Sequence, residues 1–204
     1  MDNEETSSNT LFVSLNFAQQ IINSSDTNVD ARQILMKQAI AAQLNIDNGS
    51  FNSSDSIYSA GAKDLIQEAV LWLTGKSPYS YSDGSKGNVD ANANGILDSS
   101  EYNTTTKTFT LDANGARSGT ALTSNLEAWK KLMDVDGNNS GVHVTASGEG
   151  LKNALEWYNT DKLITSADGT EVSYFNGTTV QYSMANTSDN FWEVLSQYNA
   201  DHPT

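Results

Sequence analysis

The sequence predicts a mainly α fold with a small β element, in a single domain. A chain of 204 residues can bury roughly 70% of its unfolded surface in one core. Apolar residues recur at helical spacing over most of the chain, whereas the Asn176-Gly177 pair between two β-rich runs is typical of a hairpin turn. We expect residues 1–9, which are polar, to form a disordered tail and residues 10–204 to form the domain.

The first segment of this domain is amphipathic. Leu11, Leu15 and Ile22 fall on one face of a helix, so a helix is predicted there. The alternation of apolar residues from Leu11 to Phe17 also fits a strand, and that alternative stays open. Such a segment can be buried in its own domain or against another chain, so self-assembly through residues 11–22 is a second interpretation.

Two longer helices are expected next. Residues 25–27, Ser-Asp-Thr, offer N-caps to a helix that runs through about Leu44. A second helix is predicted over residues 62–74, ended by Gly75. We expect Trp72, which this helix carries, to lie in the core or at an interface.

The second half of the chain is expected to combine short strands with helices. β-Branched residues predict a strand at 107–111, and apolar spacing predicts helices at 124–133, 148–158 and 188–198. The hairpin is predicted over residues 171–183, with a type I′ turn at Asn-Gly because both central residues of that turn need positive φ.

Residues 90–101 match the pattern of a twelve-residue calcium loop at every ligand position. Ca²⁺ takes six to eight oxygen ligands, which such a loop supplies from positions 1, 3, 5, 7, 9 and 12, while Gly at position 6 makes the turn. Gly95 stands at position 6, and the apolar Leu97 can anchor the loop to a core. The predicted ligands are the side chains of Asp90, Asn92, Asn94, Asp98 (directly or through water) and Glu101, with the main-chain carbonyl of Ile96.

A less complete copy of the pattern follows at residues 134–149. Glu149 falls beyond the register of Glu101, so this loop would be bent, wider or without its bidentate ligand. A pair of Asn/Asp/Gly turns that binds no ion is the alternative for this segment. Its candidate ligands are Asp134, Asp136, Asn138, Ser140, the carbonyl of Val142, and Glu149.

Both segments resemble the EF-hand-like and dockerin-type calcium loops of secreted proteins, over residues 89–101 and loosely over residues 134–150. The resemblance implies Ca²⁺ coordination at the ligand positions of the first loop. A dockerin loop leads directly into a helix, whereas Glu101 leads into β-branched residues that favour a strand. The likeness is therefore confined to the loops.

Composition excludes several classes of function. With 25 acidic and 11 basic residues the formal charge is −14, so a phosphate backbone would be repelled and no nucleic-acid partner is expected. The chain has no cysteine, which excludes disulfides, thiolate zinc sites and a cysteine nucleophile. No segment approaches the roughly 20 apolar residues of a transmembrane helix, so none is expected.

These features predict a secreted or cell-surface calcium-binding module without catalytic activity. Bound Ca²⁺ would relieve the acidic self-repulsion and stabilise the fold, and the module would serve adhesion or assembly with another surface protein or a glycan. A site with few carboxylates and much Asn fits the ~10⁻⁴ to 10⁻³ M affinity of extracellular modules. The sequence contains no G-x-S-x-G, Walker A or H-E-x-x-H motif.

Two alternatives belong to other classes. In a carbohydrate-binding or glycoside-active extracellular protein, Tyr79 and Tyr81 would stack on a sugar, and a pair among Glu68, Glu127 and Glu156 would supply the two carboxylates. Packing of the tyrosines beneath the calcium loop and solvation of the helical carboxylates are simpler roles for the same residues. The other alternative is a dockerin-like interaction module or a filament subunit.

Overall fold

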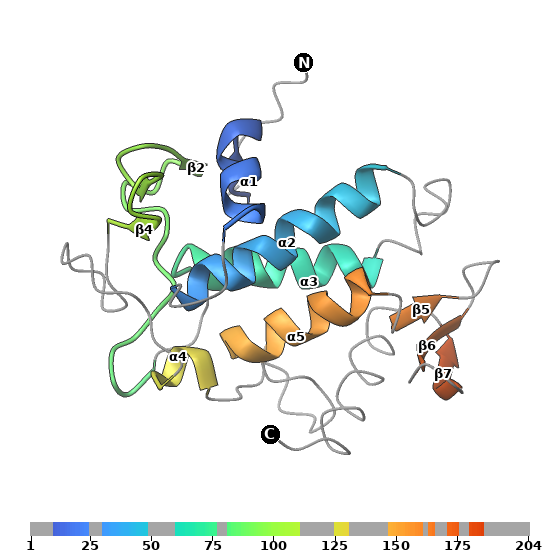
Figure 1. Cartoon of the computed structure of the whole chain (residues 1–204). Coiled ribbons are helices and arrows are strands. Elements are labelled where there is room, and N and C mark those ends of the chain that lie inside the picture. The colour runs from blue at the N-terminus through green and yellow to red at the C-terminus, as the bar shows by residue number, and fades with distance from the viewer. Residues whose placement is uncertain are drawn as a thin grey trace.

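The computed structural model confirms a mainly α architecture with small β elements (Figure 1). The expected tail at 1–9 and the expected helix at 188–198 lie outside the residues that the structure describes, and so do the side chains of 60–64 and of residues beyond 160. The described residues are 10–24, 30–48, 60–76, 81–110, 125–130, 147–160, 163–165, 171–175 and 180–185.

The described residues form twelve helices and short strands, and the strands form three small sheets. β1 pairs with β2 in parallel, β3 pairs with β4 antiparallel, and β5, β6 and β7 form an antiparallel sheet in that order. The elements are β1 (Phe12–Val13), α1 (Leu15–Ile22), α2 (Ala31–Asp47), α3 (Ala60–Leu73), β2 (Ile96–Leu97), β3 (Tyr102–Asn103), β4 (Thr108–Phe109), α4 (Glu127–Lys130), α5 (Gly148–Asn159), β5 (Leu163–Thr165), β6 (Glu171–Phe175) and β7 (Val180–Ala185).

The first segment contains both of the structures that its sequence allowed. The preferred helix is wrong for its beginning, where Phe12–Val13 is strand β1, and right from Leu15 onward, where α1 begins. Ser14 separates the two as the N-cap of α1, because its hydroxyl accepts a hydrogen bond from the Phe17 N–H at 3.4 Å. The strand exists because residues 12–13 pair with the distant residues 96–97, a contact that local spacing cannot reveal.

Helix α2 begins later than its sequence predicted. The N-cap is Asp30, whose Oδ1 accepts the Arg32 N–H at 3.0 Å, and the predicted caps at 25–27 lie outside the described residues. Asp30 also pairs with the Arg32 guanidinium, with 2.6 Å between Oδ2 and Nη2, and both side chains are buried. Asp30 is the cap in place of the nearby Ser and Thr because it also pairs with the buried Arg32, and a lone buried charge is costly.

Helices α2, α3 and α5 lie against one another and carry the core (Figure 1). The helices predicted at 62–74 and 148–158 are confirmed as α3 and α5. Trp72 is buried, as expected, and its ring meets Trp129 of α4 edge-on with centroids 6.1 Å apart. A Cβ at Gly148 would lie 2.5 Å from Trp129 and 2.6 Å from Trp72, so only glycine lets α5 begin between the two rings.

The predicted hairpin is confirmed as β6 and β7, although its connection differs. Phe175 pairs with Val180, so residues 176–179 lie between the strands instead of the Asn-Gly pair alone. The register shifts between Tyr174 and Phe175, and the predicted type I′ turn itself lies outside the described residues. Strand β5 adds an unpredicted third strand, and the strand expected at 107–111 is the shorter β4.

Candidate metal centre

The segment that enters the loop 90–101 is fixed to the helical core. The Val89 N–H donates to the carbonyl of Leu73 at the end of α3, with a distance of 2.8 Å. Gly87 packs so closely on α3 that a Cβ there would lie 2.1 Å from the Trp72 carbonyl oxygen. The Arg32 Nη1 donates to the Gly87 carbonyl at 2.9 Å, which ties the same segment to α2. Asp90, the first predicted ligand, therefore follows a segment that is hydrogen-bonded to both α3 and α2.

Asp90, at loop position 1, closes the turn. This residue is only 4% exposed. Its Oδ1 accepts the Asn94 N–H at 3.1 Å and its Oδ2 accepts the Gly95 N–H at 3.0 Å. Gly95 has φ +74°, a left-handed conformation that glycine adopts without strain. The carboxylate thus accepts hydrogen bonds from the N–H groups at loop positions 5 and 6.

The two asparagines continue this arrangement along the exposed side of the loop. The Asn92 Oδ1 accepts the Asn94 N–H at 2.9 Å, and the Asn94 Oδ1 accepts the Ile96 N–H at 2.8 Å. A carbonyl oxygen has two lone pairs, so each amide oxygen keeps one for a further donor or a cation. The positions of both oxygens are therefore set by the loop backbone before any ligand binds.

Glu101, at position 12, reaches back to the start of the loop. This residue is 1% exposed, and its Oε1 accepts the Asn92 N–H at 3.2 Å. Its Oε2 accepts the Asp98 N–H at 3.3 Å. Asp90 and Glu101 are thus two buried carboxylates from opposite ends of the loop that hold neighbouring stretches of the same backbone.

The electrostatics of this pair are unfavourable without a cation. Burial raises the pKa of Glu101, the hydrogen bonds from Asn92 and Asp98 oppose that shift, and the negative charges of Asp90 and Asp98 raise the pKa further. Within the described part of the chain, neither carboxylate has a lysine or arginine at ion-pair distance. A divalent cation between them would offset both the burial and the repulsion.

The remaining two predicted ligands are the side chain of Asp98 and the main-chain carbonyl of Ile96. The Asp98 Oδ1 accepts the N–H and the Oγ–H of Ser100, at 2.7 and 2.6 Å, and these bonds lower the pKa of Asp98. Oδ2 of Asp98, or a water held by it, is the group left for an ion. The Gly95 carbonyl accepts the Phe12 N–H of β1, and successive strand peptides point in opposite directions, so the Ile96 carbonyl faces away from β1.

The donor set consists of oxygen atoms, which suit Ca²⁺, Mg²⁺ or Mn²⁺ better than softer metals. Among the residues of known placement, no three His, Cys, Asp or Glu side chains are close enough to hold a metal by themselves. A calcium loop does not need such a group, because amide, main-chain and water oxygens complete the coordination of one or two carboxylates. The site has two buried carboxylates, a third at its edge, and oxygen atoms throughout.

The chain leaves the loop in the hairpin of β3 and β4, of which the sequence predicted only the second strand. The Thr110 N–H donates to the Glu101 carbonyl at 2.8 Å, and Tyr102 of β3 packs on Phe109 of β4 with ring centroids 5.1 Å apart. The predicted anchor Leu97 is buried in the core. This exit differs from the helix that follows a dockerin loop.

The second predicted loop is described only at its end. Glu149 lies in the first turn of α5, half-buried. Ser147, which stands where the register of the first loop would place a glutamate, is the N-cap of α5 and accepts the Gly150 N–H at 2.9 Å. The other candidate ligands, Asp134, Asp136, Asn138, Ser140 and Val142, lie outside the described residues.

The residues considered for sugar chemistry have structural partners. Tyr81 is buried in the core, so its ring offers no exposed platform, whereas Tyr79 is outside the described residues. The Glu127 carboxylate accepts the Ser82 N–H and Oγ–H at 2.7 and 2.6 Å. Glu156 pairs with Lys152 at 2.5 Å on the surface of α5. Glu68 lies half-buried on α3.

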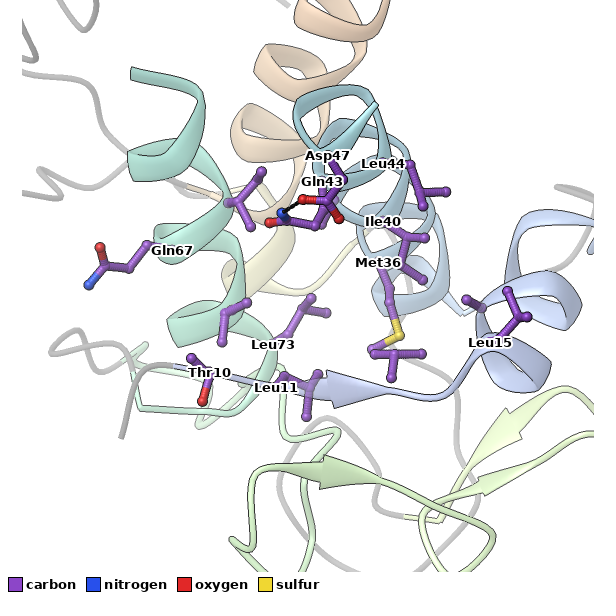
Figure 2. A pocket seen from close by; sticks show the side chains of 15 residues that line it. Thr10, Leu11, Leu15, Met36, Ile40, Gln43, Leu44, Asp47, Gln67 and Leu73 are labelled. Atoms are coloured by element: carbon purple, nitrogen blue, oxygen red, sulfur yellow. Dashed lines mark hydrogen bonds between the residues drawn. The ribbon is translucent and has the colours of Figure 1, made fainter. Parts of the chain in front are cut away.

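An apolar groove of about 640 Å³ lies beside the loop, between β1, α1, α2 and α3 (Figure 2). Figure 2 shows β1 along one side of it, with Leu11 at one end of the strand and Leu15 of α1 at the other. Leu15 is 73% exposed, and Leu44 on the facing side of α2 is also exposed. Sequence analysis missed this groove because its walls come from segments that are far apart in the sequence and meet only in the folded chain.

Comparison with protein-family models, curated proteins and solved structures finds no match to this chain. None of the helices in the described ranges is long and apolar enough to cross a membrane.

Proposed function

We propose that the chain is a calcium-binding module of a secreted or cell-surface protein, without catalytic activity, in which the ion stabilises the loop 90–101. The observation that carries this proposal is the pair Asp90 and Glu101. Both carboxylates are buried, both accept hydrogen bonds from the backbone of the same loop, and the pKa of Glu101 is raised. Such a pair is costly in an empty loop and favourable around a divalent cation.

Each predicted ligand has a distinct part in this proposal. Asp90 and Glu101 would supply the charge, since Glu101 at position 12 can bind with both oxygens. The oxygens of Asn92, Asn94 and Ile96 would fill the exposed side, and Asp98 would bind directly or through water. Because only the folded loop brings these groups together, calcium binding would raise the stability of the native state by mass action.

The proposed location outside the cell follows from the kind of site. Its few carboxylates and several neutral oxygens favour an affinity near ~10⁻⁴ to 10⁻³ M, which is met where calcium is millimolar. An adhesion or assembly role is the companion proposal. It is supported by the apolar groove between β1 and α2, since exposed apolar surface of this kind favours a protein partner over a glycan.

Calorimetric calcium titration tests this proposal. Asp90→Ala and Glu101→Ala should each abolish the stronger binding event, and Asp136→Ala should change only a weaker one. Glu156→Gln is the matched control, because it removes a carboxylate whose partner is the surface residue Lys152. Saturating calcium, at about 100 times the dissociation constant, should add about 2.7 kcal/mol to the free energy of unfolding. An unfolding midpoint that is the same in calcium and in chelator would refute the proposal.

A further inference from the structure

β1 is attached directly to the peptide groups that the loop ligands hold. The Phe12 N–H donates to the Gly95 carbonyl at 2.7 Å, which links the N-terminal segment to the loop. The N–H of the same Gly95 is held by Asp90 Oδ2 at 3.0 Å. The next residue, Ile96, pairs with Phe12 in the strand register and carries the predicted carbonyl ligand. The peptide group between Gly95 and Ile96 therefore joins the carbonyl that is bonded to β1 to the residue that carries the candidate carbonyl ligand.

β1 is a short strand that is held by its pairing with β2 and by the packing of Leu11 and Val13 against the core. It comprises only Phe12–Val13, its described strand partner is β2, and Phe12 is 60% exposed. Leu11 and Val13 are partly buried and line the groove. A two-residue parallel pairing is weak by itself, so its persistence depends on how rigid the partner backbone is.

We propose that calcium in the loop 90–101 fastens β1 to β2, so that residues 10–14 form a strap along the groove whose attachment depends on the ion. This inference rests on the calcium site proposed above. With the ion bound, the Gly95 and Ile96 peptides are held from the side opposite β1 and present a fixed edge to it. Without the ion, Asp90 and Glu101 repel each other, the edge loosens, and the strap detaches with the groove wall formed by Leu11 and Val13.

The coupling must act in both directions. If calcium strengthens the attachment of β1, then loss of that attachment weakens calcium binding by the same factor, because linkage between two sites is reciprocal. A substitution in β1, which contributes no ligand, should therefore lower calcium affinity. This distinguishes a strap from a strand that merely lies beside the loop.

Phe12→Pro is the variant that tests this coupling. It removes the N–H that donates to Gly95, while proline keeps an extended backbone and the lost phenyl ring is mostly exposed. Calcium affinity should fall about two- to tenfold, the range expected for one hydrogen bond. Leu15→Pro is the matched control and should leave the affinity unchanged. Leu15 is the first residue of α1, where the helix does not use the N–H, and Ser14 before it is already extended at ψ 153°.

Amide hydrogen exchange of the wild-type chain, resolved by residue, tests the strap without any variant. Calcium should slow exchange of the Phe12 amide roughly tenfold or more relative to chelator, while amides in the middle of α2 change less. If calcium binds but Phe12 exchange and the affinity of Phe12→Pro are both unchanged, the strap is wrong and the calcium site stands. If calorimetry detects no calcium binding to the wild-type chain, the proposed function fails, and the strap fails with it.

Discussion

The turn at Asp83 and the loop at 90–101 both use a carboxylate to hold backbone N–H groups, in the same stretch of chain. The Asp83 Oδ1 accepts the Ser85 N–H at 2.9 Å, and its Oδ2 accepts the Glu127 N–H at 2.9 Å, which caps α4. Asp83 is exposed. Burial alone would raise its pKa, but the hydrogen bonds from Ser85 and Glu127 together lower it. Glu101 accepts similar bonds, yet its pKa is raised.

The difference lies in burial and in the company of a second acid. Asp83 is solvated, so its charge is satisfied by water and by its hydrogen bonds, and it acts as a structural turn residue. Glu101 is buried beside Asp90, where hydrogen bonds do not offset desolvation and repulsion. Hydrogen bonding alone therefore does not distinguish the two acids, whereas burial beside a second carboxylate does.

Arg32→Met should have the largest effect, because Arg32 supports both regions. It pairs with Asp30, donates to the Gly87 carbonyl between the two regions, and lies 4.8 Å from the Phe109 ring centroid. The variant removes the positive charge that pairs with the buried Asp30, so we expect a loss of about 3–5 kcal/mol in the free energy of unfolding, measured in urea with chelator. Lys152→Met, which breaks an exposed pair, should cost less than about 1 kcal/mol. Equal losses in the two variants would contradict this account.

Asp83→Ala should separate the two regions. It removes the acceptor for the Glu127 N–H and should cost about 1 kcal/mol, as loss of a helix N-cap does. The stability gained on adding calcium should be the same as in the wild-type chain, because Asp83 has no part in the loop. Thermal unfolding with calcium and with chelator measures both quantities. A reduced calcium response would mean that the turn and the loop are one unit.

The pH dependence of stability should distinguish the two acids by sign, with the smallest effect of the three. In chelator, the contribution of Glu101 is fully present below its usual pKa of 4.5 and is lost as pH rises through its raised pKa. The contribution of Asp83 is present above its usual pKa of 3.8 and is lost as pH falls through its lowered pKa. Urea unfolding across pH 3–7 measures both, with Glu101→Gln and Asp83→Asn as the comparison variants.

In the presence of calcium, the contribution of Glu101 to stability should instead increase as pH rises. Protons and the ion compete for the same carboxylate, so calcium affinity should fall as pH drops through the raised pKa. Titrations of the wild-type chain at several pH values check this. An affinity that does not change with pH would place the ion away from Glu101.

Much of the fold was predictable because its signals are local. The apolar spacing of α3 and α5 and the β-rich runs of β6 and β7 identified those elements. The start of α2 was not predictable, because Asp30 is chosen as its cap through a buried pair with Arg32 that also reaches Gly87. The two-residue hairpin connection was wrong, because Phe175 pairs with Val180 and the register shifts beside it.

The sequence by itself determined the order of oxygen donors in residues 90–101, since the hydrogen bonds within that loop join residues no more than nine positions apart. Tertiary structure decided that Asp90 and Glu101 are buried, because their burial depends on packing against α3, α2 and the hairpin of β3 and β4. It also decided that Phe12–Val13 is a strand, since the partner at 96–97 is far along the chain. Local spacing encodes which groups can meet an ion, whereas the free energy of desolvating them is a property of the assembled core.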